Sequence, residues 1–244
     1  DEMKKLAMVG MVMSLFVGAA SEASFTWTNT GEGDWADGAN WDQSGYIPSN
    51  YDNISIANGG TAVVSGGTRW QRQTDLGASS ETSGNLKITG GVLGLWYNAY
   101  IGRNGGTGTM IQTGGTVEGN YGNGQGPYTL YIGSRSSSNP SGTGLYEISG
   151  GNLRADRLRV GEHVGPGTGI FRVVGSDATS IVFDDAKGGD GRVEVCATGI
   201  LDFVLDSEGV TPITALTANF LDGSLLDVSA PAGVWGTFTL MTYN

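Results

Sequence analysis

Cysteine, histidine and basic residues are scarce in this chain. The single cysteine, Cys196, excludes an intramolecular disulfide, so the fold depends on burial and backbone pairing. Cys196 lies in the strand-like run "RVEVCATG" and the single histidine, His163, in a Gly-rich turn, so a packing cysteine is favoured over a catalytic Cys and His pair. With 13 Lys and Arg against 24 Asp and Glu, the net charge is -11. This balance argues against nucleic acid as a partner, because nucleic-acid binding depends on clustered basic side chains.

Long apolar runs are also scarce, and the longest lies near the N-terminus. The stretch "MKKLAMVGMVMSLFVGAASEAS" has two lysines, then apolar residues, then small residues that suit cleavage after Ala20 or Ala23. This pattern predicts a bacterial-type signal peptide over residues 1–23, with two extraneous residues before the first Met. The apolar part is shorter than the roughly 20 residues of a membrane span, and no later segment qualifies. We therefore expect a secreted or cell-surface protein with no membrane span in the mature chain as given.

Glycine, by contrast, is abundant and regularly spaced. The chain has 43 glycines among 244 residues, and Thr, Val, Ile, Tyr and Trp occur in short runs, which is typical of an all-β protein. Gly-Gly pairs occur at 66/67, 90/91, 114/115 and 150/151, with Gly-Ser at 175/176. An apolar residue followed by Gly occurs at 76/77, 101/102, 132/133 and 160/161, and Gly-Thr-Gly at 106–108, 142–144 and 167–169. Three markers in a fixed order indicate a solenoid built from repeats.

The apolar residues between these markers predict how each repeat folds. The positions four and two residues before each Gly-Gly corner lie on one face of a strand, and two further apolar clusters follow in each unit. We predict an all-β fold, a right-handed parallel β-helix with three short strands per coil. Leu86, Met110, Tyr146 and Phe171 should then form one interior column. Gln112 departs from the apolar pattern and implies a polar partner or a local bulge. Separate hairpins at the Gly-Gly pairs remain the alternative.

The chain divides into four predicted parts. Residues 1–23 are the signal peptide, and residues 24–60 form a Trp-rich N-terminal cap with the first strands. Residues 61–176 form the β-helix repeats, and residues 177–244 form either degenerate coils or a small β end region. The interval between the Gly-Gly pairs at 114 and 150 is 12 residues longer than the standard interval of 24. A solenoid accommodates such an insertion as a loop on one face.

Several stretches resemble a known group of exported proteins. "GDWADGANW", "IPSNYDNISI" and "GGTAVVSGG", with "GTGTMIQTGGTVEG" and the ending "LDGSLLDVS" and "GTFTLMTY", resemble Gly-rich proteins sorted by exosortase, the PEP-CTERM group. More distantly they resemble autotransporter-associated passenger repeats. The resemblance covers most of the mature chain, implies a protein of the bacterial exterior, and brings no catalytic residues with it. The Pro-Glu-Pro motif, apolar span and basic tail of that group are absent here, so either the sequence stops before them or such anchoring does not apply.

The charged residues do not form a recognisable catalytic set, and we predict no catalytic residue, cofactor or metal site. Asp184, Asp185 and Asp190 in "FDDAKGGDG" could supply oxygen ligands to calcium, but their spacing matches no calcium motif and a solvated turn is favoured. In a lyase, Arg157 could bind or deprotonate an acidic sugar. Arg157 and Arg159 alternate with apolar residues, however, which predicts that they lie on the outer face, where they pair with acids or block lateral strand association.

Aromatic residues are the better candidates for ligand binding, because their rings can stack on sugars. The candidate glycan-binding residues are Trp96, Tyr100, Tyr121, Tyr128 and Tyr131. Packing against the coils is the competing interpretation of each. The predicted function is a secreted, noncatalytic structural or adhesive protein that contacts polysaccharide or other matrix components. The alternative is a polysaccharide lyase or hydrolase on the same scaffold, since a fold does not determine an activity.

Overall fold

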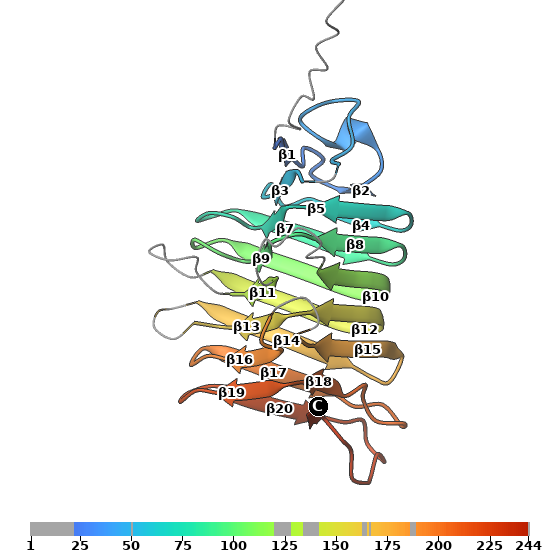
Figure 1. Ribbon diagram of the computed structural model, residues 1–244, viewed down its shortest axis with the longest axis vertical. Coiled ribbons are helices and arrows are strands. Elements are labelled where there is room, and N and C mark those ends of the chain that lie inside the picture. The colour runs from blue at the N-terminus through green and yellow to red at the C-terminus, as the bar shows by residue number, and fades with distance from the viewer. Residues whose placement is uncertain are drawn as a thin grey trace, which may run out of the picture.

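The protein is a parallel β-solenoid of about seven turns, as a computed structural model shows (Figure 1). The structure describes residues 22–49, 51–119, 128–133, 142–162, 165, 167–185 and 189–243. Strands make up 56% of the described residues, which contain no α-helix. The strands flanking Gly90 and Gly91 both pair in parallel with a strand of the next coil and not with each other. The prediction of an all-β parallel β-helix is therefore confirmed, and the hairpin alternative is wrong.

Each coil has three faces, and equivalent strands of successive coils pair in parallel. The first face contains β1 (Ser24–Thr26), β3 (Asn53–Ile56), β6 (Gln73–Leu76), β9 (Asn98–Ile101), β11 (Thr129–Ile132), β13 (Arg157–Val160), β16 (Arg192–Val195) and β19 (Thr217–Phe220). The second face contains β2 (Glu32–Asp34), β4 (Thr61–Val64), β7 (Ser83–Ile88), β10 (Thr107–Gly119), β12 (Thr143–Ala155), β14 (Thr168–Val174), β17 (Gly199–Val204) and β20 (Leu225–Ser229). The third face contains β5 (Thr68–Gln71), β8 (Val92–Leu95), the C-terminal parts of β10 and β12, β15 (Ala178–Phe183), β18 (Ile213–Ala215) and β21 (Met241–Tyr243).

The interior consists of columns of like residues, because the strands pair in register from coil to coil. Met110 is aligned with Leu86 on one side and Tyr146 on the other, and Tyr146 is aligned with Phe171. All four side chains are buried, and the rings of Tyr146 and Phe171 meet edge to face with centroids 5.4 Å apart. The predicted column is confirmed, and it continues to Leu201. Each such side chain contributes about 1.5–3 kcal/mol by its burial.

Gln112 is the polar exception in a neighbouring interior column. Its Nε2 donates to the carbonyl oxygen of Asn152 at 2.9 Å, and its Oε1 accepts a hydrogen bond from the hydroxyl of Tyr146. The register between β10 and β12 also shifts immediately after Gln112. A polar partner and a local bulge, the two explanations expected from the sequence, are therefore both present.

Two of the repeat markers are glycine for steric reasons. Gly115, at a Gly-Gly corner, has φ of +65°, in the left-handed region that other residues adopt only with strain. Gly144, in a Gly-Thr-Gly marker, lies so close to the preceding coil that a Cβ would be 2.1 Å from the carbonyl oxygen of Ile101. The markers thus recur because each coil must turn at one place and approach its neighbour at another.

The two ends of the solenoid differ. At the N-terminal end, the rings of Trp27 and Trp35 pack edge-on against Trp41, and the short 3-10 helix η1 (Gly38–Asn40) belongs to the same segment. All three Trp residues are buried. At the C-terminal end, β16 to β21 keep the parallel pairing of the earlier coils, so this region consists of further coils. Leu225 and Leu226 of the last coil are exposed.

Some predicted features lie outside the described residues. They are residues 1–21 of the predicted signal peptide, residues 120–127 of the insertion with Tyr121, and His163. Within the described ranges, the longest helix is a single 3-10 turn, and none has the length and apolar character needed to cross a membrane.

Candidate functional site

The outer surface of the first face brings tyrosines, arginines and carboxylates side by side. Strand pairing aligns Tyr100 of β9 with Tyr131 of β11, Tyr131 with Arg159 of β13, and Arg159 with Glu194 of β16. Alternate residues of a strand point to opposite faces, so these four side chains point outward while neighbours such as Leu158 are buried. The fold therefore assembles a polar strip from segments far apart in the sequence.

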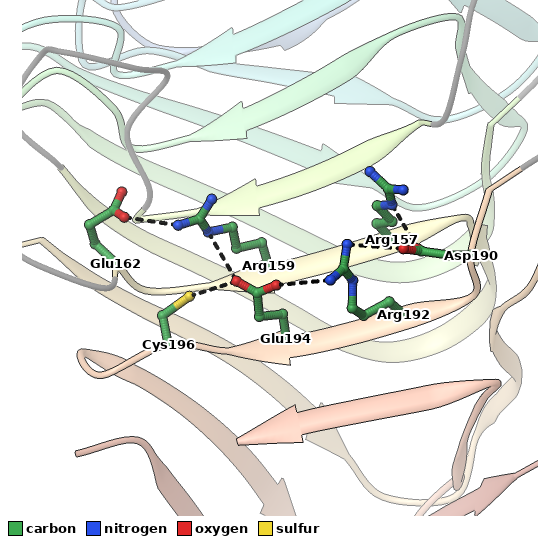
Figure 2. Close-up of polar contacts among 7 residues, drawn as sticks. All are labelled: Arg157, Arg159, Glu162, Asp190, Arg192, Glu194 and Cys196. Atoms are coloured by element: carbon green, nitrogen blue, oxygen red, sulfur yellow. Dashed lines mark hydrogen bonds and ion pairs between the residues drawn. The ribbon is translucent and has the colours of Figure 1, made fainter. Parts of the chain in front are cut away.

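Arg157 of β13 and Arg192 of β16 are also aligned on this outer surface and belong to the polar strip, and Asp190 joins them (Figure 2). Arg157 Nε donates to Asp190 Oδ1 at 2.6 Å, and Arg192 Nη2 forms an ion pair with Asp190 Oδ2 at 2.9 Å. Arg192 also lies 3.7 Å from a carboxylate oxygen of Glu194. The outward position and acid pairing expected for Arg157 are thus both found.

Arg159 lies between two carboxylates on the same surface (Figure 2). Its Nη2 donates to Glu162 Oε1 at 2.9 Å, and its Nε lies 3.7 Å from Glu194 Oε1. Burial alone would lower the pKa of Arg159, but hydrogen bonding with Cys196 and the charges of Glu162 and Glu194 outweigh burial, so the pKa is raised. The guanidinium therefore stays protonated over the whole pH range in which proteins normally work.

The tyrosines of the strip are stacked on one another and on an arginine. The rings of Tyr100 and Tyr131 are nearly parallel, with centroids 4.9 Å apart, and the guanidinium of Arg103 lies 4.3 Å from the centroid of the Tyr100 ring. Arg103 in turn donates to Asp75 at 2.6 Å. Burial raises the pKa of Asp75, although Arg103 opposes this effect. Tyr100 is consequently covered, while Tyr131 is only half-buried.

A shallow groove of about 90 Å³ lies between Tyr131 and the arginines. Its lining consists of Thr129, Tyr131, Arg157, Leu158, Arg159, Arg192 and Glu194. Sites that enclose a small molecule usually measure about 300–1,000 Å³. The groove, which we call the arginine groove, is therefore suited to contact with one face of a chain laid across it.

Tyr128, one of the five predicted glycan-binding residues, is fully buried, and the prediction for it is wrong. Its ring belongs to the hydrophobic core and lies over Gly119, where an added Cβ would meet the ring at 2.7 Å. Its backbone N–H donates to Asp156 at 2.8 Å. Burial raises the pKa of the Tyr128 hydroxyl well above its ordinary value. No face of this ring can stack on a sugar, because the whole ring lies in the solenoid interior.

The remaining aromatic candidates differ in exposure. Trp96 is 9% exposed, since the ring of Tyr51 stacks on it with centroids 4.9 Å apart and Trp70 packs at 5.5 Å. Tyr100 is 8% exposed, so packing is the better interpretation of both residues. Tyr131 alone among the described candidates offers ring surface at a groove.

The aspartates considered as weak calcium ligands are not gathered into a cation site within the described residues. Asp184 Oδ2 accepts hydrogen bonds from Arg154 Nε at 3.0 Å and Nη2 at 2.7 Å, whereas Asp190 pairs with arginines of the strip. Nowhere in the described ranges do three metal-binding side chains converge. Cys196 is buried, and burial raises the pKa of its thiol to about 11. A protonated thiol at neutral pH matches the packing role expected from the sequence.

Sequence reasoning missed Arg192 and Glu194 as members of the site. The run "RVEV" at 192–195 has the same alternation as "RLRV" at 157–160, so aligning the later coil with the earlier one would have placed them on the same face. No protein family, curated protein or solved structure matches this chain. The fold defines it as a parallel β-helix protein, and the strip with its groove is its candidate site.

Proposed function

We propose that this protein is a secreted, noncatalytic structural or adhesive component of a bacterial surface or matrix, and that its first face contacts acidic polysaccharide. The observation that carries the proposal is the arginine groove, where the half-buried ring of Tyr131 lies beside Arg157, Arg159 and Arg192. Aromatic rings pack on the apolar faces of sugars, and guanidinium groups bind carboxylates through paired hydrogen bonds. A uronic-acid polymer carries both features in every residue.

The ionisation of the strip favours binding over catalysis. A general base works best with a pKa near the operating pH. Arg159 has a raised pKa and remains a cation, and the Cys196 thiol remains protonated. Asp190 and Glu194 already interact with arginines. The alternative, a polysaccharide lyase or hydrolase, is supported only by the presence of arginines and carboxylates in one groove.

The test is retention of the protein on immobilised polygalacturonate, compared with retention on a neutral glucan. The wild-type protein should be retained on the acidic polymer in preference to the neutral one. Tyr131→Ala should weaken binding by about 0.5–1.5 kcal/mol, the usual value of an aromatic contact. Arg154→Gln is the matched control for loss of a charge, because Arg154 pairs with Asp184 outside the groove.

Two results would contradict the proposal. Equal retention on both polymers, unchanged by Tyr131→Ala, would show that the groove does not bind acidic sugar. Release of unsaturated products or new reducing ends during incubation, abolished by Arg159→Gln but not by Arg154→Gln, would support the enzymatic alternative instead.

A further inference from the structure

Among the described residues, no strand of the third face precedes β5. On the second face, Trp35 N–H donates to the carbonyl of Val63, after which the chain leaves the coil to form the cap. It rejoins the coil where Arg72 N–H donates to the carbonyl of Asp52 at 2.9 Å. The described residues between Trp35 and Asp52 form no strand of the third face, so β5 is paired with β8 alone. One edge of β5 is therefore open.

The open edge presents backbone donors and acceptors in the pattern of a strand. The carbonyls of Gly67 and Gln71 accept hydrogen bonds at 2.8 Å from the N–H groups of Val92, in β8, and Trp96, just after it. Backbone groups alternate in direction along a parallel strand, so the N–H and C=O groups of Thr68 and Trp70 point away from β8. Across the described ranges, no backbone hydrogen bond links Thr68 or Trp70 to a segment other than β8, and the Thr68 carbonyl accepts one bond from the Arg69 side chain at 3.2 Å.

A groove of about 450 Å³ runs along this edge. Residues 47–49 form one wall, and Thr68, Arg69 and Trp70 form the other. Ile47, Pro48 and the Trp70 ring make much of the lining apolar. The volume falls within the usual range of ligand sites, and an open strand edge lies at its side. We call it the edge groove.

Arg69 gives the edge groove an unpaired positive charge. Arg69 is aligned with Leu93 of the next coil, which is fully buried. An apolar residue would therefore suit the position of Arg69, and packing of the interior does not explain its charge. Among the Lys and Arg side chains that the structure describes, Arg69 is the one with no carboxylate oxygen within 4.0 Å. In a chain of net charge -11, an arginine left without an acid beside a groove favours a ligand that brings its own carboxylate.

We propose that an extended acidic peptide segment of a partner protein adds as a strand to β5 in the edge groove, with an Asp or Glu side chain on Arg69. Strand addition satisfies the outward backbone groups of Thr68 and Trp70, as in other proteins that bind peptides at an open sheet edge. A sugar chain lacks the alternating N–H and C=O groups that this edge matches. The site is separate from the arginine groove and does not depend on the function proposed for it.

The experiment uses the full chain and a labelled, end-capped peptide of sequence TVTDTVT, with TVTNTVT as the neutral probe. Fluorescence anisotropy should show saturable binding of the acidic peptide and weaker binding of the neutral one. Two further peptides carry N-methyl groups on the odd or on the even residues. Only one edge of an added strand pairs with β5, so one methylated peptide should bind like its parent and the other at least about tenfold more weakly.

Protein variants identify the site. Arg69→Gln should weaken the acidic peptide about threefold to fivefold, as expected for a partly exposed ion pair, and leave the neutral peptide unchanged. Arg154→Gln, an equal loss of charge elsewhere on the third face, and Tyr131→Ala in the arginine groove should change neither. On peptide binding, amide hydrogen exchange at Thr68 and Trp70 should slow.

Several results would overturn the proposal. They are the absence of saturable binding, equal binding of both methylated peptides, an effect of Arg154→Gln as large as that of Arg69→Gln, or unchanged exchange at Thr68 and Trp70. Displacement of the peptide by an oligogalacturonate, with the same sensitivity to Arg69→Gln, would assign the groove to glycan and would likewise refute peptide addition. If Arg69→Gln fails to fold, the comparison of the two methylated peptides still decides.

Discussion

The hydrogen bond between Gln112 and Tyr146 should couple two coils of the solenoid energetically. Gln112 Oε1 accepts from the Tyr146 hydroxyl, and its Nε2 donates to the carbonyl of Asn152, all inside the protein. Tyr146→Phe leaves one amide oxygen without its donor, which costs about 1–3 kcal/mol. Gln112→Leu leaves the hydroxyl and the carbonyl without partners, although the apolar side chain recovers part of this cost by its burial.

The double variant removes both ends of the bond, so its loss of stability should be smaller than the sum of the two single losses. We expect a coupling energy of about 1 kcal/mol, measured by urea unfolding of the wild type, the two single variants and the double variant. Equal m-values in the four proteins would show that the unfolding transition is unchanged. Additivity within about 0.3 kcal/mol would refute the reasoning, because it would mean that the two side chains do not interact.

Three further predictions concern stability and export. Burial raises the pKa of Tyr146 above its ordinary 10.0, so the folded state favours the protonated hydroxyl. The stability that this hydroxyl contributes is complete below about pH 10 and is lost as the pH rises further. Urea midpoints between pH 8 and pH 11 should fall less steeply in Tyr146→Phe than in the wild type, and identical pH profiles would contradict this. Gly144→Ala should lower the free energy of unfolding in urea by at least about 2 kcal/mol, because the new Cβ meets backbone atoms. Gly66→Ala, which has open space around the new Cβ, should lower it much less. Equal losses of stability in the two variants would be inconsistent with the close approach of Gly144 to the preceding coil. N-terminal sequencing of secreted protein should begin at Ser21 or Ser24, and retention of the preceding apolar stretch would exclude the predicted signal peptide.

The fold could be predicted from the sequence because its determinants are local and repeated. The glycine at each Gly-Gly corner is fixed by a turn, as at Gly115, and the glycine at Gly144 by contact with the preceding coil. Since these constraints recur in successive coils from Gly66 to Gly175, aligning the markers also aligned Met110 with Tyr146 and so predicted the interior column. Even the exception at Gln112 could be interpreted, because a polar residue in such a column needs a partner.

The candidate site was less predictable because exposure depends on contacts between distant segments. Trp96 is covered by Tyr51, which belongs to the N-terminal segment, and nothing near Trp96 in the sequence indicates this contact. Tyr128 follows a polar, Gly-rich insertion that suggested an exposed loop, yet the coil has already resumed at this residue. Arg192 reaches Arg157 only through the register of β13 and β16, which joins residues 35 positions apart.

The two proposed sites differ in what a ligand must displace. In the middle coils each strand is paired on both edges, and the arginines of the strip already have acidic partners. A polysaccharide at the arginine groove therefore competes with ion pairs such as that of Arg157 and Asp190, and since both side chains are partly exposed this competition costs at most about 1 kcal/mol. At the edge groove no acid has to leave Arg69 and no strand has to leave β5. Binding there breaks no ion pair and no strand pairing, so a short peptide can be sufficient, whereas binding at the strip requires a polymer that repeats a weak contact many times.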